Sequence, residues 1–195
     1  MRGGGRHGGG PRLSVAGVAG VVGQGAAAPG RSPARCLQWE QRVGDYPFWQ
    51  VVYHSLFYLD FYLSPREAAF APQSFHRTDY EHFGFNADGQ PCTADVPYEK
   101  DVLLNYVQHC RRKIDEIISA ETEESLAGPS GFWWYKIPRA EFHLNNIRHI
   151  QHHASQLSLN LRRAAGIQIN WVGSGWKEQA DSKLPSGNLG TDEGG

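Results

Sequence analysis

The chain has 195 residues, a length that suits one domain. Its 19 Lys and Arg almost balance its 20 Asp and Glu, which argues against a dedicated nucleic-acid-binding protein. No apolar run approaches the roughly 20 residues that cross a membrane, and the three cysteines have no paired spacing that would indicate a disulfide framework. We therefore expect a cytoplasmic protein that binds neither membranes nor nucleic acids.

The two ends of the chain differ in composition from its middle. Residues 1–36 contain 11 of the 23 glycines and no acidic residue, so we expect this Gly/Arg-rich segment to be disordered. A targeting signal around residues 13–28 is one alternative, and a miscalled upstream start codon is another. Residues 173–195 are rich in Gly and Ser and are expected to form a flexible tail. This leaves residues 37–172 as the predicted folded domain.

The first predicted helix spans residues 48–63, with the sequence FWQVVYHSLFYLDFYL. This segment has no Gly or Pro, and Ser64-Pro65 ends it. Sixteen unbroken residues are too many for a typical strand. Because the segment is apolar nearly all round, we expect it to be buried on most sides.

Two further helices are predicted, at residues 97–122 and 139–165, separated by the breaking sequence Gly128-Pro129-Ser130-Gly131. Gly166 is the predicted C-cap of the last helix. Cys110 falls on the apolar stripe of the middle helix and is predicted to be a core residue. Residues 64–96 form a long connection rich in His, Phe and Tyr, which indicates a functional or mobile segment. The predicted inward stripe of the last helix is Ile147, Ile150, Ala154, Leu157 and Leu161.

His149 and His153 are four residues apart in the last predicted helix. One turn separates them, so both imidazoles project from the same face and can share a metal ion. Asn145 and Gln156 extend this polar ridge, and His152 lies on its flank. The alternative interpretation is a pair of solvated or hydrogen-bonded histidines on a polar helix face.

His54 interrupts the otherwise apolar first helix. Alone it is more often a core histidine with a hydrogen-bond partner. Together with His149 and His153 it gives three imidazoles on facing helices, which is the ligand set of an open catalytic metal site. Position 150 is Ile and not Glu, so the last helix does not carry the HExxH protease motif, and the chain has no Gly-rich phosphate loop or nucleophile elbow.

Three segments, FWQVVYHSLFYLDFYLS, GFWWY and NNIRHIQHHASQLSLNLRR, together resemble the DinB-like family of metal-binding four-helix bundles. The resemblance covers residues 39–171. It implies that His54, His149 and His153 bind a divalent metal, most often nickel or zinc. It also implies an all-α, up-and-down bundle, and an activity that uses a low-molecular-weight thiol, as in the family's thiol-dependent transferases and isomerases.

The chain departs from this family at its start. The family's first helix appears truncated or replaced by the Gly-rich segment, and only residues 37–42 remain for it. Three long helices leave one side of the core open, which predicts a homodimer through that side. The alternative is that residues 37–39 and the aromatic stretch at residues 70–85 fold back over it.

Two classes of function follow from these residues. The first is a metal-dependent enzyme, of thiol-dependent transferase or hydrolase type, acting on a small-molecule substrate. The second is a non-catalytic metal-binding or dimerisation module. Four residues are predicted to orient the ligands or the substrate, namely Tyr58, Asn145, His152 and Gln156. No other catalytic residue is assigned, and Tyr58 has the alternative interpretation of a core tyrosine.

Overall fold

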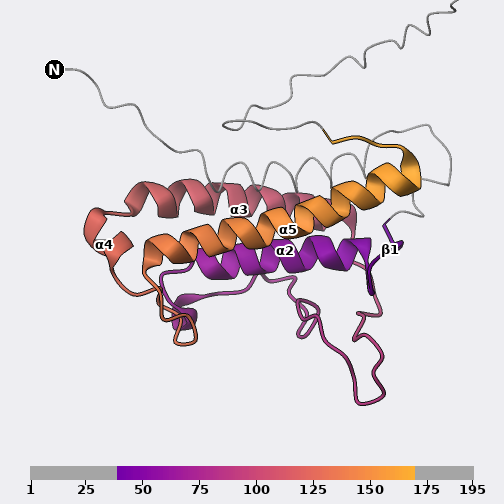
Figure 1. The fold of residues 1–195 in the computed structure, drawn as a ribbon, viewed down its shortest axis with the longest axis horizontal. Helices are drawn as coiled ribbons and strands as arrows, with labels where there is room; N and C mark the ends of the chain where they lie inside the picture. Colours follow the sequence, from indigo (N-terminus) through magenta and orange to yellow (C-terminus); the bar gives the residue numbers. More distant parts are fainter. Residues whose placement is uncertain (1–38, 170–195) are drawn as a thin grey trace, which may run out of the picture.

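The computed structural model describes residues 39–169, which form a mostly helical structure (Figure 1). Three long helices dominate it, and the remaining elements are a small hairpin, a 3-10 turn and a short helix. This content confirms the predicted all-α class. The elements in chain order are β1 (Arg42–Val43), β2 (Tyr46–Pro47), α2 (Phe48–Leu63), the 3-10 helix η2 (Glu67–Ala69), α3 (Lys100–Ala120), α4 (Glu123–Ala127) and α5 (Arg139–Ala165).

The long helices agree closely with their predicted ranges. Helix α2 has the predicted bounds, and α5 ends at Gly166, which adopts the left-handed conformation with φ 65° and donates to the carbonyl oxygens of Leu161 and Arg162. Helix α3 is shorter than the predicted range, because Glu99 and Glu121 at its two ends are extended.

Two small elements escaped prediction. Strands β1 and β2 form an antiparallel hairpin around Gly44, which has φ 63°. Helix α4 begins with a capping box between Thr122 and Ser125, in which each side chain accepts the other residue's backbone N–H. Both elements are too short to show a hydrophobic period.

Helix α2 contacts both α3 and α5. His54 meets His149 and His153 near the middle of α5, whereas Leu63 meets Arg139 at the start of α5, so α2 and α5 are antiparallel. The predicted up-and-down order is wrong for the pair α2 and α3.

Helix α3 runs in the same direction as α2. Leu56 contacts Cys110, and Ser64, eight residues further on, contacts Lys113. Parallel neighbours need a connection that returns along the length of the first helix. Residues 64–99 supply it, and they are long enough to span α2, whose 16 residues measure about 24 Å.

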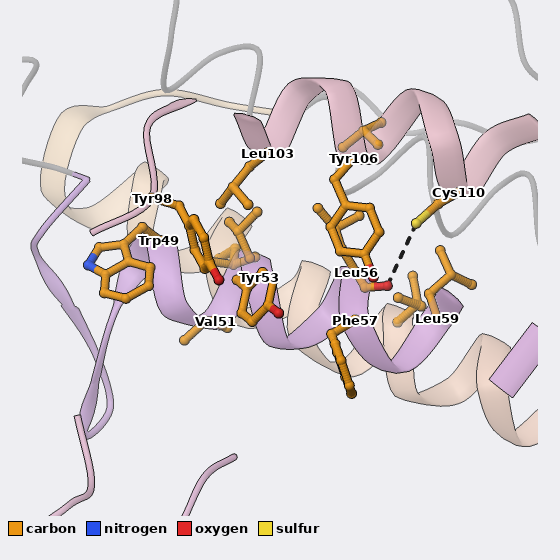
Figure 2. Close-up of a cluster of buried hydrophobic side chains, with 14 of the residues drawn as sticks. Trp49, Val51, Tyr53, Leu56, Phe57, Leu59, Tyr98, Leu103, Tyr106 and Cys110 are labelled. Atoms are coloured by element: carbon orange, nitrogen blue, oxygen red, sulfur yellow. Dashed lines mark hydrogen bonds between the residues drawn. The ribbon is translucent and has the colours of Figure 1, made fainter. Parts of the chain in front are cut away.

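The core is built on α2, of which thirteen residues are buried. Figure 2 shows its aromatic side chains, including Tyr53, beside Tyr98 and Tyr106 at the α3 side. Cys110 is buried, as predicted, and its thiol donates to the carbonyl oxygen of Leu56 over 3.6 Å.

The connection at residues 64–99 covers the side of α2 that was expected to be open. Phe70 contacts the ring of Phe57, and Phe83 stacks on His54 with a centroid distance of 3.9 Å. Trp39 is also buried and packs against Phe48. The face of α2 that motivated the homodimer prediction is therefore covered by the chain itself.

Several predictions lie outside the described residues. They concern the N-terminal segment at residues 1–36, the fate of the family's first helix and the tail at residues 173–195. Within residues 39–169, none of the helices combines the length and the apolar character that crossing a membrane would require.

Candidate metal site

The side chains of His54, His149 and His153 converge between α2 and α5. The Nε2 atom of His149 lies 3.1 Å from that of His54 and 3.2 Å from that of His153. One ligand nitrogen from each residue lies within 4.8 Å of the others, and no second such group occurs in the described part of the chain. The structure thus brings together the three histidines that the sequence singled out.

Hydrogen bonds fix the orientation of two of these rings. Nδ1 of His54 donates to the carbonyl oxygen of Glu81 over 2.6 Å. Nδ1 of His153 donates to Oε1 of Gln156 over 3.0 Å. In a neutral imidazole with a proton on Nδ1, Nε2 carries a lone pair. Both Nε2 atoms therefore face the centre of the group as electron-pair donors, which is the tautomer that a metal ligand needs.

The third ring leaves the group short of protons. Nδ1 of His149 is buried without a hydrogen-bond partner among the described residues. A proton on Nε2 of His149 can make a good hydrogen bond to only one of its two neighbours, Nε2 of His54 or Nε2 of His153. The lone pair of the other nitrogen then has no proton facing it. A cation removes this conflict. Two nitrogens on one tetrahedral zinc ion are separated by roughly 3.3 Å, close to the 3.1 and 3.2 Å found here.

Burial keeps the three imidazoles neutral. Together with a smaller effect of neighbouring histidines, it lowers the pKa of His54 to about 3, against the hydrogen bond to Glu81, which raises it, and the pKa of His149 to about 4. It also lowers the pKa of His153 to about 4, against the hydrogen bond to Gln156, which raises it. The site is thus in its metal-binding protonation state well below neutral pH.

Aromatic rings surround the histidines. Phe83 stacks on His54, as described above, and Tyr58 lies 4.8 Å from His54 and 5.6 Å from His149 between ring centroids. Tyr62 lies 6.2 Å from His149. These rings limit the access of water, which strengthens electrostatic interactions inside the site.

The other predicted site residues are placed as follows. Tyr58 contacts the histidine rings, but its hydroxyl lies 3.2 Å from Nδ1 of His82. His152 is exposed and pairs with Gln156 over 3.1 Å, so it reaches His153 through that side chain. Asn145 is half-buried and has no hydrogen bond to the three histidines in the described part of the chain.

The next residue of α5, Asn146, is buried, and its side-chain amide donates to the carbonyl oxygen of Leu59. The predicted inward stripe is confirmed for three of its five members. Ile150, Leu157 and Leu161 are buried, whereas Ile147 and Ala154 are only partly buried.

Sequence reasoning missed Glu81. Glu81 is only 7% exposed, and its Oε2 atom has no hydrogen-bond partner among the described residues. Oε1 lies 3.6 Å from Nε2 of His82 and 4.0 Å from Nε2 of His76. The hydroxyl of Tyr53 pairs with Nδ1 of His76 over 2.5 Å. The density of His and aromatic residues in this connection was a signal that the segment is functional, but it did not single out an acid.

The arrangement is that of an open metal site. Three neutral imidazole nitrogens are good ligands for several first-row divalent metals. Three protein ligands leave at least one coordination position for a small molecule, which separates such a site from a closed structural one. Comparisons of the chain with protein-family models, with curated proteins and with solved structures gave no match. The functional argument therefore depends on this geometry.

Proposed function

We propose that this protein is a DinB-like, metal-dependent enzyme that uses its three-histidine site for thiol-dependent transfer or for hydrolysis. The observation that carries the proposal is the convergence of three Nε2 atoms with an open coordination position. The His-bearing segments that resemble the DinB-like family support the same function. Nickel or zinc is the proposed metal, and a small electrophile is the proposed substrate.

When bound, the metal supplies Lewis-acid chemistry, because it lowers the pKa of a thiol or water molecule at its open position. The protein's own residues prepare the site for this. The three imidazoles remain neutral, and Glu81 and Gln156 hold two of them in the required tautomer. Burial and the negative charge of Glu81 raise the pKa of Tyr58, so this residue is an uncharged phenol beside the site.

Metal analysis of the purified protein tests the proposal. We predict about one divalent metal ion per chain, by analogy with other three-histidine sites, and a sharp loss of occupancy in His149→Ala. Gln151→Ala is the matched control, because it removes an exposed side chain two residues along the same helix. Equal occupancy in wild type and His149→Ala would disprove the metal site.

A thiol-conjugation screen on the metal-loaded protein then separates an enzyme from the alternative, a non-catalytic metal-binding or dimerisation module. Low-molecular-weight thiols are offered with a set of electrophiles, and activated esters are offered without thiol. We expect turnover that is lost in His149→Ala and kept in Gln151→Ala. A protein that binds metal but turns over none of these substrates would favour the non-catalytic module.

A further inference from the structure

Glu81 reaches the three-histidine site with two of its groups. Its carbonyl oxygen accepts the proton of His54 Nδ1, so its backbone is in direct contact with a proposed ligand. Its carboxylate lies 3.6 Å from Nε2 of His82, whose Nδ1 lies 3.2 Å from the hydroxyl of Tyr58, and the Tyr58 ring contacts both His54 and His149. The backbone of Glu81 therefore touches the group, and its buried carboxylate is joined to the group through His82 and Tyr58.

The carboxylate of Glu81 differs in its partners from Asp60, the other buried acid of the described chain, and from the partly buried Glu121. Asp60 has the ammonium group of Lys113 at 2.6 Å, and Glu121 has the guanidinium group of Arg139 at 3.1 Å. Glu81 has only two imidazoles, at 3.6 and 4.0 Å, and one of its oxygens has no partner. A buried carboxylate is costly unless an opposite charge lies near it.

The metal site has the complementary deficit. Three neutral imidazoles bring no negative charge, so a divalent ion bound there retains both of its positive charges in a buried position. Within the described part of the chain, the side chains that contact the three histidines include no acid, and they are Tyr58, Tyr62, Phe83, His152 and Gln156.

We infer that Glu81 is a positioning residue of the metal site, whose carboxylate supplies the counter-charge for the bound ion while its carbonyl group orients His54. This inference rests on the proposed metal site. It explains why this buried acid lacks a lysine or arginine partner, since the metal ion is the missing cation. Residues near metal ligands commonly change metal affinity by about 10–100-fold when they are mutated.

Titration of the full-length protein with Zn²⁺ tests the inference. Glu81→Gln keeps the backbone carbonyl group and the approximate shape but removes the charge, and we expect its Kd to rise about 10-fold or more. Glu81→Asp keeps the charge and should bind more tightly than Glu81→Gln. Asp79→Asn is the matched control, because it neutralises an exposed acid two residues away. It should bind as wild type does, since Asn also tolerates the positive φ of 70° at this position.

The spectrum of bound Co²⁺ separates a charge effect from a distorted site. We expect Glu81→Gln to keep the wild-type visible spectrum while binding Co²⁺ more weakly. Equal Kd values in wild type and Glu81→Gln, or a changed spectrum in this variant, would overturn the inference. If Glu81→Gln does not fold, Glu81→Asp and Glu81→Asn give the same comparison of a charged with a neutral side chain. Both side chains are one methylene group shorter than Glu. Absence of Zn²⁺ binding to the wild type would instead overturn the proposed metal site itself.

Discussion

Burial decides the chemistry of the three histidines. Because the pKa values of His54, His149 and His153 fall to about 3, 4 and 4, these rings carry no proton to displace at pH 6.5. Three ordinary histidines with pKa near 6.5 would release about 1.5 protons on binding a metal at that pH. The two cases therefore differ in the number of protons released.

We predict that Zn²⁺ binding releases almost no imidazole protons at pH 6.5, and that its affinity changes little between pH 6 and 7.5. The sign follows from the lowered pKa values, since protons compete with the metal only as the pH falls toward 4. Calorimetric titration in two buffers with different ionisation enthalpies measures the released protons. A release of more than one proton would show that the histidines are solvated in solution.

At this scale the sequence was sufficient to predict the three converging histidines but not the residues that orient them. The spacing of His149 and His153 needs only the helical repeat, and His54 was visible because its helix is otherwise apolar. Glu81 was not predictable, because its contact with His54 depends on the path of an irregular connection. The predicted role of Asn145 stays a prediction, because Asn145 makes no hydrogen bond to the three histidines within the described residues.

At the scale of the elements, Arg139 joins the end of α2 to the start of α5. Its guanidinium group donates to the carbonyl oxygens of Leu63 and Ser64, which the end of α2 leaves without helical partners. Its Nε donates to Glu121 over 3.1 Å. Arg139 is only 4% exposed, so these bonds are made away from water.

We predict that Arg139→Met lowers the free energy of unfolding by about 3–5 kcal/mol, since it leaves several buried carbonyl groups without a partner and removes the cation beside Glu121, which keeps only its bonds to His143 and Ser125. Arg139→Lys keeps the charge but has no planar fork, so we expect an intermediate loss. Urea denaturation followed by circular dichroism measures both variants. A loss below about 1 kcal/mol in Arg139→Met would mean that water replaces these bonds.

Gly131 connects the segment before α5 to the end of α2. It has φ +88°, and a Cβ atom there would overlap the carbonyl oxygen of Pro65. We predict that Gly131→Ala destabilises the protein by more than the about 1–3 kcal/mol that backbone strain alone costs. Gly89→Ala is the matched control, because Gly89 has φ +73° and open space around its Cβ position. Equal losses of stability in the two variants would contradict the close approach of Gly131 to Pro65.

The elements divide by length in how well the sequence predicts them. Helices α2 and α5 are long enough for composition and period to fix their bounds. Helix α4 and the β1–β2 hairpin depend on single turns, and the only sequence signals were the Thr122–Ser125 spacing and Gly44. The direction of α3 depends on the connection at residues 64–99, whose path follows from packing and not from a repeat.

At the scale of the whole molecule, the covering of α2 changes the argument for a homodimer. The prediction assumed that apolar side chains such as Phe57 and Leu59 would remain exposed, whereas both are buried within the chain. Burying an apolar face contributes about 25 cal/mol per Å² whichever segment covers it. The connection packs on Phe57 and His54 and therefore provides part of the stabilisation that the prediction assigned to a second subunit, and the homodimer stays a prediction.

Light scattering at micromolar concentration measures this property directly. A homodimer that dissociates in the nanomolar range gives about twice the chain mass of 21.7 kDa, whereas covering of α2 by its own connection predicts the mass of a single chain. Exposing this face tests the same argument, because Phe70→Ser and Phe83→Ser remove two rings that pack on α2. If the connection replaces a partner, these substitutions should lower the melting temperature and promote self-association. The contrary result is a dimeric wild type whose mass and melting temperature do not change with either substitution. It would mean that the dimer interface lies elsewhere and that the connection does not protect α2 from association.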